Sequence, residues 1–209
     1  LGGVGILHRF MSPEQQVEDV KAIQKYFKEH SISLPIAASV GVKDEGKKRA
    51  DLLAELGVEI LTVDIAHGDS IMMMEVLEYM KKNHPQVDII AGNVATAEAT
   101  ARLISAGADA VKCGIGPGSM CTTRIITGHG VPQLTAIALC VGEAKKHGIP
   151  VIADGGIKNS GDMVKALCAG ADSIMIGSLV SGTMETPGEV KSGKKLYRGM
   201  ASKSAQVSW

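Results

Sequence analysis

Seven short apolar runs recur along this chain of 209 residues, and longer segments with a helical pattern separate them. The runs are continuous rather than alternating in polarity, which is typical of strands buried on both faces of a parallel sheet. Regular alternation of such strands with helices predicts a parallel α/β architecture. The expected strands are residues 4–7, 35–42, 60–66, 87–94, 110–115, 150–153 and 173–176.

Helix signals lie between these runs. Residues 13–28 follow Ser12, a good N-cap, and place a proline at the first helical position. Residues 97–105 follow Thr96, a second N-cap candidate, and a third helix is expected over 162–169. The triplet of basic residues at 47–49 is interpreted as a solvated helix face.

One helix-to-strand junction is repeated almost unchanged at residues 54–59, 105–109 and 168–172. In each, a glycine (Gly57, Gly107 or Gly170) follows the helix and can adopt the left-handed conformation that ends it. We predict a single catalytic domain over residues 1–209 with the (β/α)₈ TIM-barrel fold. Seven strands and an abrupt start suggest that the first βα unit is missing. An open doubly wound sheet is the alternative, but polar residues at several strand ends favour a barrel.

Composition narrows the possible functions. The 22 basic and 22 acidic residues cancel, which argues against a protein that coats nucleic acid. Aromatic residues make up only 3%, so a base-stacking platform is not expected, and no apolar run suggests a membrane span. The four cysteines lack metal-ligand spacing, which predicts reduced thiols in the cytoplasm. Three of them, Cys113, Cys140 and Cys168, are expected to be buried.

The segment 114–124 contains the most informative motif. Alternate glycines at Gly114, Gly116 and Gly118 permit unusual backbone angles and leave main-chain polar groups free to meet a ligand. Ser119 adds a hydroxyl suited to a phosphate oxygen, and Cys121 follows on the same loop as a candidate nucleophile. The alternative is a tight turn that happens to contain a cysteine.

Other strand ends carry polar residues as well. Asp154 precedes two glycines, the second being Gly156, and this combination suits a ribose diol and a phosphate. Gly177 and Ser178 end the last expected strand. Each of these would be an ordinary turn in isolation, but with Ser119 they give three loops converging on one anion, as barrel phosphate sites do. At an earlier strand end, Asp64 and His67 could contact a cofactor ribose or assist proton transfer; a histidine that caps the strand end is the alternative. Asn93 is another polar strand-end residue expected to face the same mouth.

Residues 114–124 resemble the signature loop of the IMP dehydrogenase/GMP reductase family. The resemblance runs in order from residues 2–8 through 154–157, 177–178 and 197–200, and so covers nearly the whole chain. It implies a (β/α)₈ barrel, usually a homotetramer, that acts on a purine nucleoside monophosphate. In a dehydrogenase, NAD takes hydride from IMP and water hydrolyses a covalent thioimidate to give XMP. In a reductase, ammonia leaves GMP and NADPH supplies hydride to give IMP.

The resemblance also implies residue roles. Cys121 would attack the purine C2 and Thr123 would act at the reaction site, while Asp64 and Asn93 would lie on the cofactor side. Asp154 would bind the ribose, and the backbone of Met200 and Ala201 the base. The carbonyls of Gly116, Gly118 and Cys121 match the family's K⁺ site. The residues matching its phosphate site are Ser119, Gly156, Gly177, Ser178 and Tyr197.

Within the family, residues 124–133, 182–189 and 197–200 look dehydrogenase-like, whereas 40–44 and 64–68 look reductase-like. Ile65 and Ala66 stand where dehydrogenases usually carry two serines. The expected strand 35–42 follows the first helix almost directly, so no CBS regulatory modules are expected within the chain, and the family's mobile flap is expected beyond Trp209. We favour an NAD-dependent IMP dehydrogenase over an NADPH-dependent GMP reductase. An inactive nucleotide-binding paralogue and a sugar-phosphate barrel enzyme, which would give Cys121 no purpose, are further alternatives.

Overall fold

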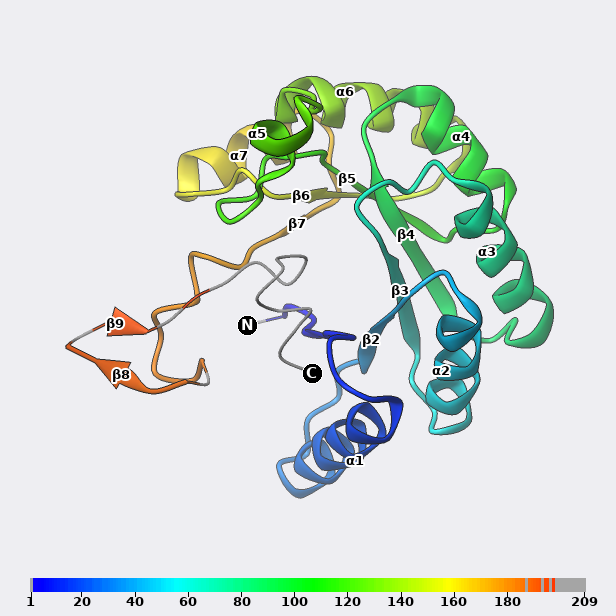
Figure 1. Ribbon diagram of the computed structural model, residues 1–209, viewed down its shortest axis with the longest axis vertical. Coiled ribbons are helices and arrows are strands. Elements are labelled where there is room, and N and C mark those ends of the chain that lie inside the picture. Colours follow the sequence, from blue (N-terminus) through cyan, green and yellow to red (C-terminus); the bar gives the residue numbers. More distant parts are fainter. Residues whose placement is uncertain (1, 187, 193, 196, 198–209) are drawn as a thin grey trace.

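A computed structural model describes residues 2–186, 188–192, 194–195 and 197 (Figure 1). Its main sheet contains seven parallel strands, and their spatial order follows their order in the sequence. A doubly wound sheet would reverse its strand order at a switch point, so that alternative is wrong. The sheet is curled, with the order and connections of a (β/α)₈ barrel. The strands are β1 (Ile6–Leu7), β2 (Ala37–Val40), β3 (Ile60–Asp64), β4 (Asp88–Val94), β5 (Ala110–Cys113), β6 (Val151–Asp154) and β7 (Ser173–Met175).

Helices connect these strands and cover the outer side of the curve (Figure 1). The expected caps are confirmed: the Ser12 hydroxyl accepts a bond from the Gln15 amide, and the Thr96 hydroxyl from the Ala99 amide. The last helix begins earlier than expected because Asn159 caps it. The helices are α1 (Pro13–Glu29), α2 (Asp44–Glu55), α3 (Ile71–Asn83), α4 (Ala97–Ser105), α5 (Thr123–Thr127), α6 (Gln133–Ala144), a 3₁₀ turn (Lys145–His147) and α7 (Ser160–Cys168). A short antiparallel hairpin of β8 (Val190–Lys191) and β9 (Lys194–Lys195) follows.

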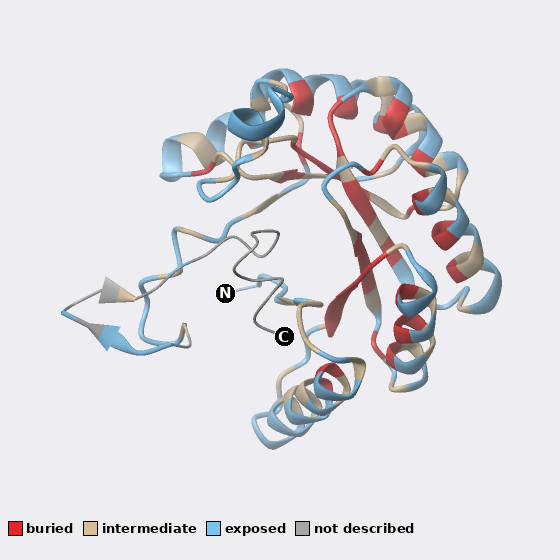
Figure 2. Cartoon of the chain, in the orientation of Figure 1, coloured by how far each residue is buried: buried red, intermediate tan, exposed pale blue. Residues whose placement is uncertain are grey.

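The apolar core lies between the sheet and the helices (Figure 2). Side chains alternate along each strand. In β3 and β5, Val63 and Val111 are fully buried in this core, where Leu53 of α2 and Leu103 of α4 also lie. The intervening strand positions face the interior of the curve. Polar residues at those positions are therefore carried into the inside of the barrel.

The repeated junction ties neighbouring strands together. The predicted left-handed glycines are confirmed at Gly57, Gly107 and Gly170, with φ of +79°, +106° and +104°. Two residues later comes an acidic residue that pairs with one residue at the start of the adjacent strand, or directly before it. The acidic residue donates its amide to the carbonyl of that partner, and its carboxylate accepts the partner's amide. The closed pairs are Glu59 with Ile36, Asp109 with Ile89, and Asp172 with Val151, with carboxylate-to-amide distances of 2.9, 2.7 and 2.8 Å.

Two expectations about single side chains were wrong. Arg49 is not solvated: only 1% of the residue is exposed. Its guanidinium donates to Gln16 Oε1 at 2.8 Å and to the Met11 carbonyl at 2.9 Å, and it also pairs with Glu45. Cys168, expected to be buried, is exposed at the end of α7, whereas Cys113 and Cys140 are buried as expected. Arg49 therefore joins α1 and α2 to the loop after β1.

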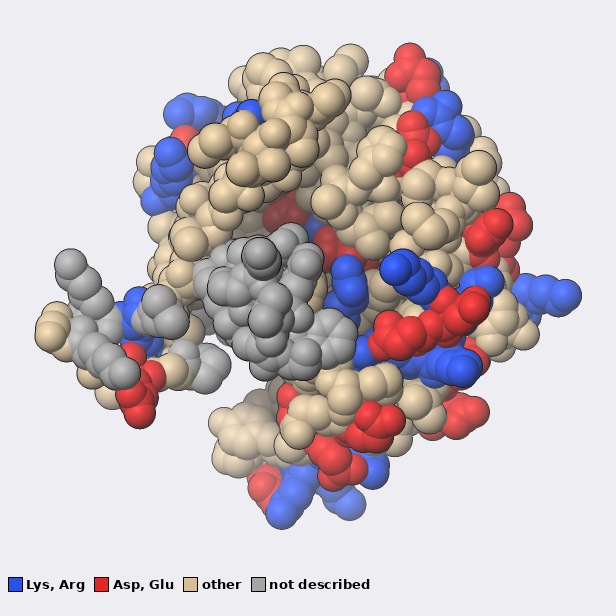
Figure 3. Space-filling model, in the orientation of Figure 1, with Lys and Arg blue, Asp and Glu red and all other residues tan. Residues whose placement is uncertain are grey.

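Charge is unevenly distributed over the face shown in Figure 3. Acidic and basic side chains gather over the helices at the right and bottom of the view, whereas the surface over α5 is largely uncharged. Ile125 and Ile126 of α5 are 84% and 77% exposed. No helix in the described part of the chain is long and apolar enough to cross a membrane.

Candidate active site at the carboxyl ends of the strands

The glycine-rich loop after β5 packs closely against the end of β6. Gly114 has φ of +140°, and a Cβ there would lie 2.2 Å from the Asp154 carbonyl oxygen. A Cβ on Gly155 would lie 2.9 Å from the Gly118 amide nitrogen. Only glycine permits both the backbone angle and the close approach. The loop is thus fixed by contacts with the neighbouring strand end.

Cys121 lies at the exposed end of this loop. Its amide donates to the Gly118 carbonyl at 3.0 Å, which closes a turn, and its thiol lies 3.2 Å from the Thr123 hydroxyl, to which it donates. Cys121 is a free, exposed thiol. The two residues predicted to act in catalysis are therefore hydrogen-bonded to each other. Cys121 lies just before α5, and Thr123 is its first residue.

A cavity of about 170 Å³ opens beside this thiol. It brings together eight residues named in the sequence analysis, which come from the end of β3 and the loop after it, from β4, from the loop after β5 and from the start of α5. Its lining is Arg9, Phe10, Asp64, Ile65, Ala66, Asn93, Gly114, Ile115, Gly116, Cys121 and Thr123. Loop segments far apart in the sequence thus meet at one end of the sheet, which is where a (β/α)₈ barrel places its active site.

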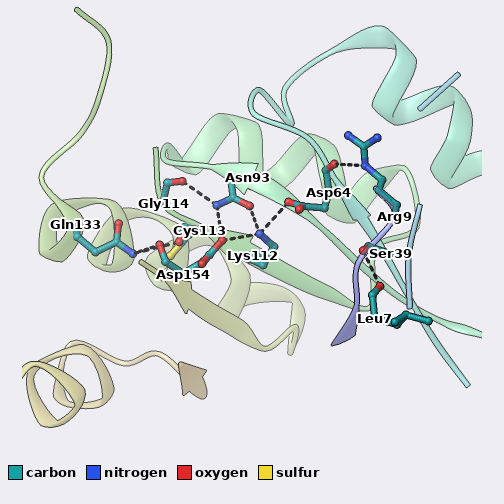
Figure 4. Close-up of polar contacts among 10 residues, drawn as sticks. All are labelled: Leu7, Arg9, Ser39, Asp64, Asn93, Lys112, Cys113, Gly114, Gln133 and Asp154. Atoms are coloured by element: carbon teal, nitrogen blue, oxygen red, sulfur yellow. Dashed lines mark hydrogen bonds and ion pairs between the residues drawn. The ribbon is translucent and has the colours of Figure 1, made fainter. Parts of the chain in front are cut away.

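Beneath this cavity lies a lysine that the sequence analysis did not single out. Lys112 of β5 is 3% exposed, and its ammonium donates to Asp64 Oδ1 at 3.0 Å and to Asp154 Oδ2 at 2.6 Å (Figure 4). It also contacts the side-chain oxygen of Asn93. The Asn93 amide nitrogen in turn donates to Asp154 Oδ2 at 2.9 Å and to the Gly114 carbonyl at 2.8 Å. One buried cation therefore links three predicted site residues.

The carboxylates decide the protonation of this lysine. Burial disfavours the charged ammonium, but Asp154 and Asp64 together outweigh that effect and raise the pKa of Lys112 above its ordinary value. The ammonium is therefore charged at neutral pH. The cluster has a formal charge of −1, since two carboxylates face one cation.

The predicted phosphate residues are only partly gathered. Gly177 lies against Tyr197: a Cβ on Gly177 would come within 2.8 Å of the tyrosine hydroxyl. Gly156 packs near Pro117 of the glycine-rich loop. Ser119 is exposed, and no hydrogen bond among the described residues joins it to Ser178. Met200 and Ala201 lie outside the described residues.

The expected cation-binding carbonyls lie on the same loop. The Gly118 carbonyl accepts the Cys121 amide, whereas the carbonyls of Gly116 and Cys121 accept no hydrogen bond from the described part of the chain. Main-chain oxygens of this kind are hard ligands suited to an alkali cation. Over the same described ranges, no cluster of three histidine, cysteine or acidic side chains is placed to hold a metal ion.

Fold and site together define a (β/α)-barrel protein with an exposed thiol on a glycine-rich loop and a carboxylate–lysine cluster beside it. The chain belongs to the IMP dehydrogenase / GMP reductase family, whose domain model matches residues 1–208. It is 51% identical over 199 residues to an inosine-5'-monophosphate dehydrogenase from Aquifex aeolicus, covering 92% of this chain and 41% of the relative. It is 49% identical over 195 residues to the enzyme of that name from Staphylococcus aureus, covering 91% and 40%.

A solved structure supports the same family. A GMP reductase variant from Trypanosoma brucei in complex with guanosine 5'-monophosphate superposes with a TM-score of 0.80 at 48% identity, covering 83% of this chain and 38% of that one. The chain therefore spans about 40% of the length of the relatives it matches. The relatives carry the names of both activities within the family.

Proposed function

We propose that the protein carrying this chain oxidises IMP to XMP with NAD, with Cys121 as the covalent nucleophile. The observation that carries the proposal is the exposed Cys121 thiol, hydrogen-bonded to Thr123 on the rim of a cavity that Asp64 and Asn93 also line. Relatives named as IMP dehydrogenases, at 49–51% identity, favour this activity.

In the proposed reaction, the Cys121 sulfur forms a bond to C2 of the purine as the thiol loses its proton. NAD⁺, when bound, accepts the hydride that leaves C2. Water then adds at C2, and cleavage of the C–S bond releases XMP and restores the thiol. Thr123 holds the thiol through its hydroxyl, 3.2 Å from the sulfur, and so keeps it facing the cavity.

The remaining site roles are part of the same proposal. Asp154 would bind the ribose. The phosphate would be held by Ser119, Gly156, Gly177, Ser178 and Tyr197, and the base by the backbone of Met200 and Ala201. Asp64 and Asn93 would face the cofactor, and a K⁺ ion would take the carbonyls of Gly116, Gly118 and Cys121. Open carbonyls on Gly116 and Cys121 fit such an ion. We also propose a cytoplasmic homotetramer.

A GMP reductase is the second candidate, because a specific feature of the cavity favours it. Ile65 and Ala66 line the cavity where the family's dehydrogenases usually have serines. Their apolar side chains cannot donate hydrogen bonds to a dinucleotide. The superposed structures are also named as GMP reductases.

The deciding measurement is the absorbance of reduced nicotinamide, followed with the full-length protein. One reaction contains IMP, NAD⁺ and K⁺, and the other contains GMP and NADPH. Absorbance that rises only in the first establishes the dehydrogenase, and a fall only in the second establishes the reductase. Silence in both, with nucleotide binding retained, would identify a nucleotide-binding protein without this activity.

Replacing the nucleophile tests the covalent step. Cys121→Ala is expected to retain nucleotide binding, because the phosphate and ribose contacts lie elsewhere. Turnover should fall at least about 10³-fold. Calorimetric titration with IMP measures the binding, and the nicotinamide assay measures the turnover. Normal turnover by the alanine variant would rule out the covalent mechanism. Cys168→Ala, which removes the other exposed thiol, is the matched control and should leave turnover unchanged.

A further inference from the structure

The carboxylates of Asp64 and Asp154 share an asymmetry. Each gives one oxygen to the Lys112 ammonium, and Asp154 Oδ2 also accepts from Asn93. The second oxygen of each carboxylate, Oδ2 of Asp64 and Oδ1 of Asp154, accepts no hydrogen bond from the described residues. The side chains of Asp64 and Asp154 are 44% and 24% exposed, while that of Lys112 is 3% exposed. Lys112 thus lies behind the carboxylates. Neither Lys112 nor Asp154 lines the cavity, but the Asp154 side chain reaches solvent beside it, whereas Lys112 does not.

We propose that Lys112, supported by Asn93, is a positioning residue that fixes the Asp154 carboxylate so that its open oxygen accepts a ribose hydroxyl of the bound nucleotide. This inference rests on the proposed function, since it assigns the nucleotide ribose to Asp154. Two donors on Oδ2 hold the carboxylate plane in one orientation. The buried ammonium also offsets the repulsion between two carboxylates that would otherwise face each other across the strand ends.

The chemistry of Lys112 excludes a direct role in proton transfer. A general acid or base works best when its pKa lies near the operating pH, and the pKa of Lys112 is raised above its ordinary alkaline value. Its ammonium is also fully committed, with three partners for three donors: Asp64, Asp154 and Asn93. Lys112 therefore acts on the ligand only through the side chains that it holds.

The test compares two ligands, IMP and 2′-deoxy-IMP, by calorimetric titration of the full-length protein. In the wild type, loss of a hydroxyl that meets a charged acceptor should weaken binding by about 10-fold or more. In Lys112→Met, the ammonium no longer holds Asp154 in place. Because the effects of two coupled groups are not additive, the preference for IMP over 2′-deoxy-IMP should fall below about 3-fold. A merely structural lysine would weaken both ligands equally and leave the preference intact.

Arg49→Met is the matched control, because it removes a second buried cation that lies outside the site. It should retain the wild-type preference for IMP. If Lys112→Met does not fold, Asn93→Ala decides by the same ratio, because it removes the other donor to Asp154 Oδ2. A reduced preference in that variant supports the inference.

The outcomes separate the two proposals. A wild-type preference that persists in Lys112→Met, or in Asn93→Ala where the first variant does not fold, overturns the inference but leaves the proposed function standing. A wild type that binds IMP and 2′-deoxy-IMP equally also overturns the inference alone. A wild type that binds no IMP overturns the proposed function, and the inference with it.

Discussion

Two buried cations, Lys112 in β5 and Arg49 in α2, show how the same kind of side chain serves different ends in this molecule. Arg49 is bound by a glutamine oxygen, a main-chain carbonyl and Glu45, and it joins two helices to the loop after β1. Lys112 is bound by two carboxylates and an amide: Asp64 and Asn93 line the cavity beside Cys121, and the Asp154 side chain next to them is 24% exposed. The partners of Arg49 hold the fold, whereas the two carboxylates that bind Lys112 each retain an open oxygen for a ligand.

The largest effect on stability is expected at Arg49. Arg49→Met leaves Gln16 Oε1 and the Met11 carbonyl without their donor in a buried place. Removing one partner from such a buried polar cluster costs about 3–5 kcal/mol. Urea denaturation of the full-length protein, at one fixed protein concentration, measures this loss. A change below about 1 kcal/mol would show that the cluster contributes little to the fold and would break the comparison.

Lys112→Met should cost less, about 1–3 kcal/mol, because its carboxylate partners reach solvent and can be hydrated once the ammonium is gone. The cost should also depend on pH. The folded pKa of Lys112 lies above its ordinary value of 10.5, so its contribution is fully present below that value and lost as the pH rises through the folded pKa. Denaturation of wild type and variant between neutral and strongly alkaline pH measures the difference. A gap that widens with rising pH would contradict the assignment.

The smallest effect on stability is expected at Glu45, and it shows how much of the contribution of Arg49 comes from the ion pair. Its side chain is 52% exposed, and solvent screens its attraction to the guanidinium. Glu45→Gln should therefore change the unfolding free energy by only about 0.2–1 kcal/mol. The same urea titration compares it with Arg49→Met. If the two variants lost equal stability, the ion pair rather than the buried hydrogen bonds would hold α1 and α2 together.

The strands are predictable because each is a continuous apolar run, and the starts of α1 and α4 because Ser12 and Thr96 are N-cap residues. The start of α7 is missed by two residues because its cap, Asn159, does not enter the prediction. The two buried cations were not predicted. Arg49 follows two lysines, and its charge suggests that it shares their solvated face. It nevertheless falls on the helical stripe of Gly46, Ala50 and Leu53, all of which are buried. That periodicity is the pattern that would have revealed it.

Lys112 lies within an apolar run, so the sequence pattern does not mark it as a site residue. Its position between Val111 and Cys113, both buried in the core, places it on the opposite, inward side of β5. A charged residue there requires partners, and Asp64 and Asp154 were already recognised at the ends of two other strands. What the sequence alone does not supply is the register that brings these strand ends level, because it depends on pairing across the sheet.

The closed pairs that Glu59, Asp109 and Asp172 form with the neighbouring strand affect which parts of the chain can change without loss of the fold. Three strands, β3, β5 and β7, are joined in this way to the strand before them, at the end of the sheet opposite the thiol and the lysine cluster. The alignment of these three strand pairs is thereby fixed at that end. The loops at the other end need not hold the strands in place, and their length and composition are free to follow the demands of the ligand.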